Sequence, residues 1–251
     1  MPTVKVNDIN MYYEVHGDGE PLLVIWGMGG EISTFVDYMD NLNKNYKLIF
    51  FDSRGTGRTD KPDEQYSFEM MADDAIGLMD KLNIKSAHIL GISMGSRIAL
   101  VIAAKYPESV KSLILNVAAS RSTCDDLQAA RSYERLYAAM TQPEFLEVMG
   151  GYPPTAESFI RLFEALKNFD GRDLLPKINA PTLIVNSTKD DSTPVTFAEE
   201  LFEGISNSKL ILVEEDHLFI RTKPGLLIEP VLEFLKELDR KRTNENVKEV
   251  I

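Results

Sequence analysis

The chain has 251 residues, 44% of them apolar and 26% charged, which is ordinary for a globular protein with a sizeable core. Its 39 acidic residues outnumber its 27 basic ones, so the net charge of −12 opposes binding to a nucleic-acid backbone. Cys124 is the only cysteine, which excludes an intrachain disulfide. No apolar run spans a bilayer, and the first ten residues lack the pattern of a signal peptide. We therefore expect a cytoplasmic protein with no nucleic-acid or membrane partner.

Short β-branched apolar runs alternate with stretches of helical periodicity along most of the chain. The first two runs, 4–6 and 11–15, flank a turn and predict an antiparallel hairpin. The others are apolar throughout, which is typical of parallel strands covered on both faces, and comprise 22–26, 48–51, 88–90, 112–115, 182–185 and 210–213. This alternation predicts an α/β fold with a doubly wound, mostly parallel sheet of about eight strands.

One of the helical stretches begins after Ser67, a residue suited to an N-cap. Its apolar side chains lie mostly three or four residues apart and form a single stripe. Asp73 and Asp74 fall away from that stripe, so we expect both carboxylates to face solvent.

The alternation of strands and helices stops between about residues 120 and 178. This segment has no β-branched run but contains the helix-like stretches 125–140 and 155–169. We interpret 120–178 as a helical insertion in a core domain formed by 1–119 and 179–242. The last residues, 243–251, are polar, and we expect them to form a frayed tail.

The run Gly91-Ile92-Ser93-Met94-Gly95 carries the chemistry of the chain. It fits the pattern G-x-S-x-G, and it lies between a predicted buried strand and a predicted helix, which is the context that a nucleophile elbow requires. The two glycines let the turn pack closely, so that the Ser93 hydroxyl projects from the carboxyl end of the strand. The backbone N–H of Met94, at the start of the helix, is a candidate oxyanion donor.

Several spaced motifs extend this pattern. The loop 27–30 (GMGG) looks like an H-G-x-G loop, and the loop 52–60 (DSRGTGRTD) is similar to D-x-R-G-x-G-x-S. The run 181–185 with Asp190 and Pro194 looks like the strand that bears a triad acid, and His217 before Lys223-Pro224 looks like a catalytic histidine segment. The sequence resembles the α/β-hydrolase family over nearly its whole length. The resemblance implies that 120–178 is a small helical cap.

The order of residues along the chain gives an independent check on the base. In this family the triad runs Ser, then Asp or Glu, then His. Of His16, His88 and His217, only His217 follows Ser93. We expect His88 to be packed within its strand and His16 to be exposed.

Two adjacent carboxylates compete for the role of the triad acid. Asp190 and Asp191 both follow the strand 182–185, and the spacing of four residues to Pro194 selects Asp190. Asp216 adjoins His217, but we expect its side chain to point elsewhere. The family's alternative acid position, after the strand 112–115, holds the uncharged Asn116.

The resemblance also implies the surroundings of the nucleophile. The second oxyanion donor is expected to be the backbone N–H of Met28, while Trp26 stands where the family usually has histidine. The cap is expected to close over a mainly apolar substrate pocket, for which the candidate residues are Trp26, Tyr133, Tyr137 and Met140.

These residues predict a serine hydrolase that acts on a small ester, lactone or related acyl substrate through an acyl-enzyme, with no metal or organic cofactor. Dehalogenase and epoxide hydrolase chemistry is disfavoured because it uses an aspartate nucleophile. Other enzymes of the same scaffold remain open, namely acyltransferase, carbon–carbon bond hydrolase, lyase, cofactor-free perhydrolase and aminopeptidase. A ligand-binding receptor with slow turnover also remains open, and so do the natural substrate and the oligomeric state.

Three further motifs have simpler interpretations. Gly55 and Gly57 lack the third glycine or lysine of a phosphate loop, which favours a structural loop held by Asp52 and Arg54. The acidic run 214–217 lacks the ligand spacing of a metal site. The sequon at 186–188 lies at the end of a strand, and we expect it to be unused.

Overall fold

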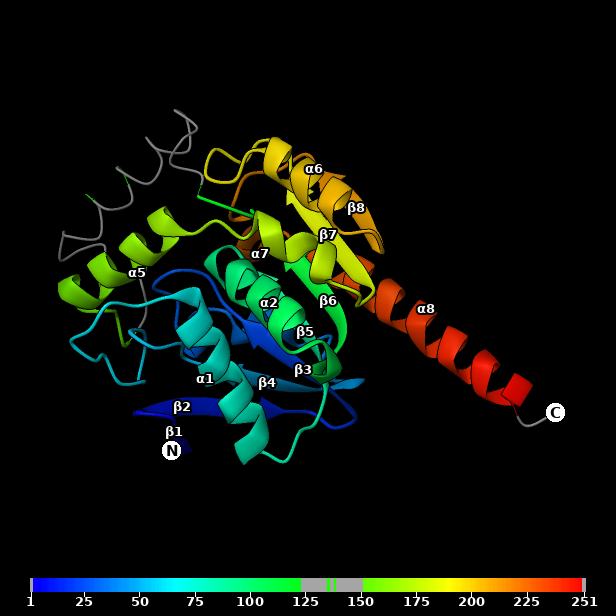
Figure 1. Cartoon of the computed structure of the whole chain (residues 1–251), viewed down its shortest axis with the longest axis horizontal. Helices are drawn as coiled ribbons and strands as arrows, with labels where there is room; N and C mark the ends of the chain where they lie inside the picture. The colour runs from blue at the N-terminus through cyan, green and yellow to red at the C-terminus, as the bar shows by residue number, and fades with distance from the viewer. Residues whose placement is uncertain (1, 123–134, 136–137, 139–150, 250–251) are drawn as a thin grey trace.

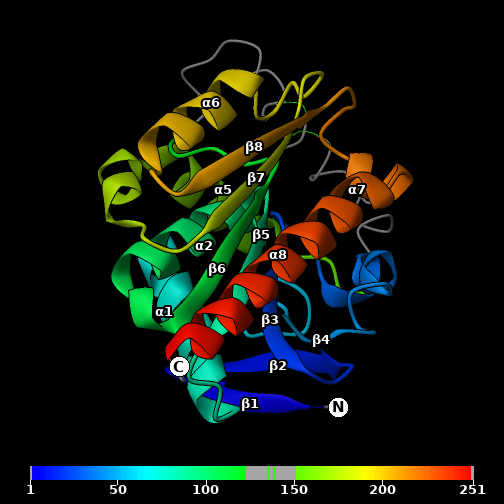
Figure 2. The same cartoon turned by 90° about the vertical axis from the view of Figure 1, so that its right-hand side faces the viewer.

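A computed structural model describes residues 2–122, 135, 138 and 151–249 and places eight strands of this part of the chain in one sheet. Their order across the sheet is β1-β2-β4-β3-β5-β6-β7-β8 (Figures 1 and 2). The strands are β1 (Thr3–Val6), β2 (Ile9–His16), β3 (Glu20–Ile25), β4 (Tyr46–Phe51), β5 (Ala87–Ile92), β6 (Val110–Asn116), β7 (Thr182–Ser187) and β8 (Ser208–Val213). The predicted doubly wound α/β sheet is confirmed.

The hairpin at the amino terminus supplies the antiparallel edge. β1 pairs with β2 and β2 pairs with β4 in antiparallel fashion, whereas the strands from β4 and β3 through β8 are parallel. Asn7 has a φ of 48°, a left-handed conformation that asparagine tolerates better than most residues. The turn therefore needs only two residues, and β2 begins at Ile9, two residues earlier than the sequence predicted.

Helices cover both faces of the sheet. α1 (Phe68–Lys81), α2 (Met94–Lys105) and α6 (Val195–Gly204) lie on one face, and α8 (Gly225–Glu249) crosses the other (Figure 2). The remaining described helices are α5 (Ala156–Asn168), α7 (Phe219–Thr222) and the short 3₁₀ turns η1 (Ile32–Thr34), η2 (Val36–Met39), η3 (Pro107–Ser109) and η4 (Arg172–Lys177). None of the helices in the described residues combines the length and the hydropathy needed to cross a bilayer.

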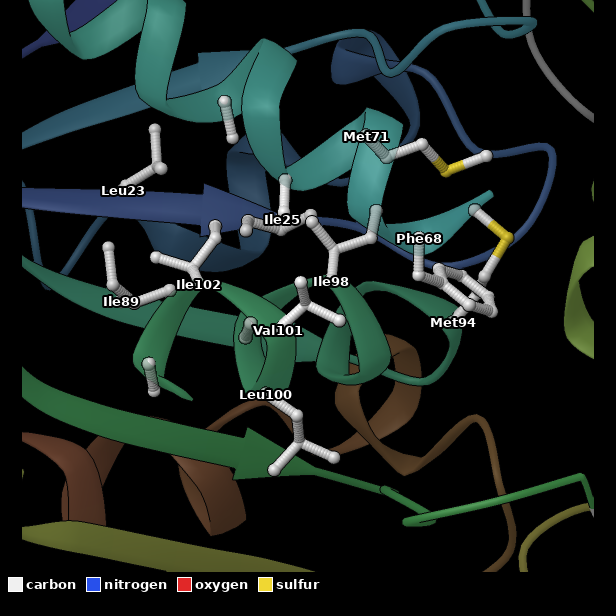
Figure 3. Packing of buried hydrophobic residues seen from close by; sticks show 14 of the residues in the cluster. Leu23, Ile25, Phe68, Met71, Ile89, Met94, Ile98, Leu100, Val101 and Ile102 are labelled. Atoms are coloured by element: carbon white, nitrogen blue, oxygen red, sulfur yellow. The ribbon is translucent and has the colours of Figure 1, made fainter. Parts of the chain in front are cut away.

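The core has two layers because successive side chains of a strand point to opposite faces. On β3, Leu23 and Ile25 join the cluster beneath α1 and α2, whereas Leu22 and Val24 join the cluster beneath α8. Ile98 and Ile102 of α2 lie close to the β3 and β5 side chains (Figure 3). Both layers are apolar, which explains why the central strands are continuous apolar runs in the sequence.

One charged residue of α1 lies where the sequence did not predict it. Ser67 caps the helix as expected, accepting a hydrogen bond from the Met70 N–H. Asp74, however, is buried, and its carboxylate binds the buried guanidinium of Arg54 at 2.9 Å. The prediction that Asp74 faces solvent was therefore wrong, because the partner that draws it inward comes from another element. Asp73 does face outward, and it pairs with Lys105.

The insertion and the carboxyl terminus were predicted in part. The expected helix at 155–169 is confirmed as α5, with the Thr155 hydroxyl as its N-cap. The expected helix at 125–140 lies outside the described residues apart from 135 and 138, and the boundaries of the cap stay a prediction. α8 continues to Glu249, past the expected helix end near 242, because the intervening residues contain no glycine or proline to end the helix.

Candidate active site

Ser93 occupies a strained turn between β5 and α2. Its φ of 54° and ψ of −118° are unusual for a residue other than glycine. The turn is held by the Ser93 N–H, which donates to the Asn116 carbonyl at 2.9 Å, and by the Ser93 carbonyl, which accepts from the Ser96 N–H and hydroxyl. Strain of this kind persists only where the surrounding structure imposes it.

The two glycines of the motif make this turn possible. A Cβ on Gly91 would lie 2.6 Å from the Gly95 carbonyl oxygen, and a Cβ on Gly95 would lie 2.1 Å from the Ile25 carbonyl oxygen. Both contacts are with backbone atoms, which cannot move aside. Only glycine therefore lets α2 start this close to the strands, which is the close packing predicted for the motif.

His217 and Asp190 meet Ser93 at the carboxyl ends of the strands. Ser93 Oγ lies 2.9 Å from His217 Nε2, and His217 Nδ1 lies 2.7 Å from Asp190 Oδ2. Ser93 follows β5, Asp190 follows β7 and His217 follows β8, so the topology of the sheet brings together residues that are distant in sequence. All three residues that the sequence singled out form one continuous hydrogen-bonded chain.

The Asp190 carboxylate is almost fully buried and accepts several hydrogen bonds. Its Oδ1 accepts from the N–H groups of Ser192 and Thr193, and its Oδ2 accepts from the Thr193 hydroxyl as well as from His217. Burial raises the pKa of this carboxyl, but the charge of His217 and these hydrogen bonds outweigh the burial, so its pKa lies below the usual range. Asp190 is thus held as an anion that orients the imidazole.

Thr193 was not predicted from the sequence. Its hydroxyl contacts both Asp190 and His217, with 3.4 Å between Thr193 Oγ1 and His217 Nδ1. The signal was present, since serine and threonine that follow an aspartate by two or three residues often bond back to its carboxylate. Asp191 is exposed, and Asp216 accepts from the Leu218 N–H instead of reaching His217.

The loop after β3 passes directly against the nucleophile. A Cβ on Gly27 would lie 3.2 Å from Ser93 Cβ and 3.7 Å from Ser93 Oγ, so Met28 follows a residue in contact with the serine. Met94 is the first residue of α2, where helix N–H groups have no intrahelical partner. The two N–H groups expected to bind an oxyanion therefore belong to segments that adjoin Ser93. Their role as donors stays a prediction.

Trp26 packs into the core at the base of this loop. The residue is 8% exposed, and its ring stacks on Phe35 with 4.1 Å between centroids and 5° between planes. The indole also fills the space beside Gly30, where a Cβ would lie 1.9 Å from Trp26 Cδ1. These contacts hold the loop. Its backbone is therefore positioned by Trp26, without the histidine that is usual in the family. Tyr133, Tyr137 and Met140, the other pocket candidates, lie outside the described residues.

A network of charged residues holds the loop that follows β3. The buried Asp52 accepts from the Ile32 N–H at 2.8 Å and from the Arg58 N–H at 2.8 Å. The Arg58 guanidinium in turn binds the buried carboxylate of Glu31 at 3.1 Å. The glycine-containing loop that follows β4 is thus structural, and it ties the segment after β3 to the sheet.

Comparison with known proteins places this chain in a family. The model of the alpha/beta hydrolase fold matches residues 20–150. Serine hydrolase BPHL from Mus musculus is 32% identical over 250 residues, covering 92% of this chain and 85% of the relative. The putative carbamate hydrolase RutD from Azorhizobium caulinodans is 27% identical over 266 residues, covering 96% and 100%.

The chain belongs to the alpha/beta hydrolase fold family.

The solved structure of the enol-lactonase from Burkholderia xenovorans superposes with a TM-score of 0.82 over 94% of this chain and 100% of that one, at 21% identity. The similarity supports the fold, and the curated relatives are named as hydrolases. Like them, this alpha/beta hydrolase is an enzyme that catalyses hydrolysis.

The remaining polar candidates have structural surroundings in this hydrolase. His88 is buried and bonds the Ser112 hydroxyl at 2.7 Å, as expected for a packed strand residue, whereas His16 is only partly exposed and pairs with Glu14. Asn186 of the sequon is buried and accepts from the Ala118 N–H. Within the described residues, no three His, Cys, Asp or Glu side chains converge as metal ligands would.

Proposed function

We propose that this alpha/beta hydrolase is a serine hydrolase that cleaves a small, mainly apolar ester, lactone or related acyl substrate through an acyl-enzyme. The observation that carries the proposal is the relay from Ser93 Oγ to His217 Nε2 and from His217 Nδ1 to Asp190. A serine hydroxyl joined to an imidazole is activated for attack on a carbonyl carbon, which favours acyl transfer over displacement at saturated carbon.

The relay suggests a two-step reaction. Ser93 Oγ attacks the carbonyl carbon as its proton passes to His217 Nε2, and the oxygen of the tetrahedral intermediate accepts hydrogen bonds from the Met28 and Met94 N–H groups. The C–O bond to the alcohol then breaks, and the leaving alkoxide takes the proton from Nε2. A water molecule repeats the sequence on the acyl-enzyme and releases the acid and Ser93. The scheme needs neither a metal nor an organic cofactor.

Names among the relatives agree with this chemistry. A carbamate, an enol-lactone and an ester all present a carbonyl carbon next to a heteroatom that can leave, and the relatives include a putative carbamate hydrolase and a solved enol-lactonase. The burial of Asp190 and its lowered pKa support an acid that stays ionised while it orients His217. The serine motif is thus embedded in the context that its chemistry requires.

The test combines turnover with covalent labelling. We expect p-nitrophenyl esters of rising chain length to be hydrolysed, and a fluorophosphonate probe to modify Ser93, as located by mass spectrometry of peptides. Ser93→Ala should lower kcat by about 10⁴-fold or more and abolish labelling, because triad members act as a unit. Ser109→Ala, in η3 beyond the carboxyl end of α2, is the matched control and should retain normal turnover.

Two results would count against the proposal. A Ser93→Ala chain that keeps most of its ester turnover would overturn the assignment of the nucleophile. A single stoichiometric burst with every ester, followed by no turnover, would instead favour a ligand-binding member of the family. Including a lactone and a carbamate in the panel separates the candidate substrate classes.

A further inference from the structure

Arg97 is fully buried, yet it forms no ion pair with a carboxylate of the described residues. It lies on α2, four residues after Ser93, within the apolar stretch that packs on the sheet. Its Nε–H has no hydrogen-bond partner. Arginine carries its charge at every physiological pH, so a positive charge is held in the interior beside the nucleophile elbow.

Among the described residues, the other buried arginine, Arg54, and the half-buried Arg58 are both paired with carboxylates. Arg54 is surrounded by the carboxylates of Asp8, Glu64 and Asp74. Arg58 contacts those of Glu14, Glu31 and Asp52. Both of these guanidinium groups are thus neutralised by carboxylates. Burying a charge without an ion pair is costly, and no carboxylate of the described residues pairs with Arg97, so Arg97 calls for a different explanation.

The two hydrogen bonds of Arg97 place its charge at the elbow. One guanidinium nitrogen donates to the Ser93 carbonyl oxygen at 3.5 Å, and the other donates to the Arg121 carbonyl oxygen at 3.4 Å. Both bonds are long compared with the usual length of about 2.9 Å, so they do not satisfy the guanidinium fully. The Ser93 carbonyl already has two closer donors, both from Ser96, and does not need Arg97 to be satisfied.

We propose that Arg97 is a positioning residue whose charge, unpaired by any described carboxylate and held at the Ser93 carbonyl, favours the anionic states of the reaction. The inference rests on the proposed function, because it assigns a role in acyl transfer at Ser93. The guanidinium contacts the Ser93 carbonyl, whereas His217 contacts Ser93 through Oγ. The guanidinium therefore stabilises the negative charge that develops on the attacking and carbonyl oxygens more than it opposes the positive charge on the imidazole. Because the Arg97 side chain is fully buried, water screens its attraction for this negative charge only weakly.

Most other charges near α2 and His217 are neutralised locally. The exception is Arg221, four residues after His217, which forms no ion pair with a described carboxylate and whose buried Nε has no hydrogen-bond partner. Near α2, Arg121 pairs with Glu200, Arg172 with Asp170, Asp73 with Lys105 and Asp74 with Arg54. Near His217, Glu214 pairs with Lys189, Glu215 pairs with Lys223, and Asp216 accepts from the Leu218 N–H. Asp190 binds the imidazole directly, and Asp191 follows Asp190 on the exposed side of the loop.

The test compares Arg97→Met, which is neutral and of similar length, with Arg97→Lys, which keeps the charge. The readout is the rate constant for fluorophosphonate labelling of Ser93 as a function of pH, with ester kcat/KM alongside. We expect Arg97→Met to react roughly 10- to 100-fold more slowly. The pH dependence of this rate should also differ from that of wild type, because the cation no longer acts on the charges that form at the elbow. Arg97→Lys should recover most of the rate and restore the profile.

Thermal unfolding separates this role from packing. We expect Arg97→Met to melt at or above the wild-type temperature, because the variant no longer buries an unpaired charge. An Arg97→Met chain that melts well below wild type, or that keeps the wild-type rate and pH profile, would overturn the inference. If wild-type Ser93 is not labelled at all, the proposed function fails instead, so the two failures are distinguishable.

Discussion

At the scale of single residues, the site distinguishes two neighbouring carboxylates that look alike in the sequence. Asp190 is 4% exposed and accepts hydrogen bonds from His217 and from the Ser192 and Thr193 N–H groups. Asp191 lies on the exposed side of the same loop. The turn that follows Asp190 supplies hydrogen-bond donors to its carboxylate. A carboxylate at position 191 would not receive these hydrogen bonds.

We therefore expect Asp190→Asn to lower the kcat for p-nitrophenyl esters by about 10⁴-fold, because an amide stabilises the wrong imidazole tautomer. Asp191→Asn should change kcat by less than about threefold, since an exposed carboxylate has little influence on a buried site. Steady-state kinetics on the two purified variants, with their folding checked by circular dichroism, measures this difference. The opposite pattern would show that Asp191 is the triad acid.

Sequence reasoning located the residues whose roles are encoded in a local motif or in chain order. Ser93 was predicted from its glycines, His217 from its position after Ser93, and Asp190 from its spacing to Pro194. Thr193 and Arg97 were missed because their significance depends on neighbours. Thr193 matters only because the loop folds back on Asp190, and Arg97 stands out only because no carboxylate of the described residues pairs with it.

At the scale of elements, Arg54 joins the hairpin, the loop after β4 and α1. Its guanidinium binds Asp8 in the β1–β2 turn, Glu64 ahead of α1 and Asp74 within α1. Side-chain burial is nearly complete for Arg54 and Asp74, whereas Asp8 and Glu64 are partly exposed. The bond to Asp74 is therefore the least screened of the three, and we expect it to contribute most to stability.

We predict that Asp74→Ala lowers the free energy of unfolding by about 3–5 kcal/mol, because it removes the buried partner of a buried charge. The change should appear as a fall in Tm of roughly 6–20 °C in a chain of this size. Asp73→Ala, one position away, is the control, and loss of its exposed pairing with Lys105 should cost at most about 1 kcal/mol. Equal losses for the two variants would contradict the assignment.

Elements were predicted well where their own residues determine them. The central strands are apolar on both sides because helices cover both faces of the sheet. The apolar stripe and the Ser67 N-cap of α1 predict this helix from its own residues. Asp74 could not be placed from its helix alone, since Arg54 is 20 residues away in the sequence. The end of α8 was misjudged because polarity was interpreted as fraying, although nothing in that segment stops a helix.

At the scale of the whole molecule, the net charge of −12 bears on which substrates reach Ser93. A negative field lowers the local concentration of anions and slows their association. We expect kcat/KM for a neutral ester to exceed that of a matched ester bearing a distant carboxylate, and the gap to narrow as salt rises from about 0.01 M to 0.15 M. A preference for the anionic ester would point to a cationic substrate contact, with Arg131 and Arg135 in the expected cap as the first candidates.

The hydrogen bond between Ser93 and His217 joins residues 124 positions apart, and the cap segment lies between them in the sequence. The elbow belongs to the first half of the chain, while its base and its acid arrive with β7 and β8. A ribosome adding about 5–20 residues per second would thus expose the serine for several seconds or more before its partners exist. A nascent chain stalled before β8 should carry a serine that reagents barely touch. The chain length at which Ser93 begins to react with a fluorophosphonate would therefore show when β8 has joined the sheet during synthesis.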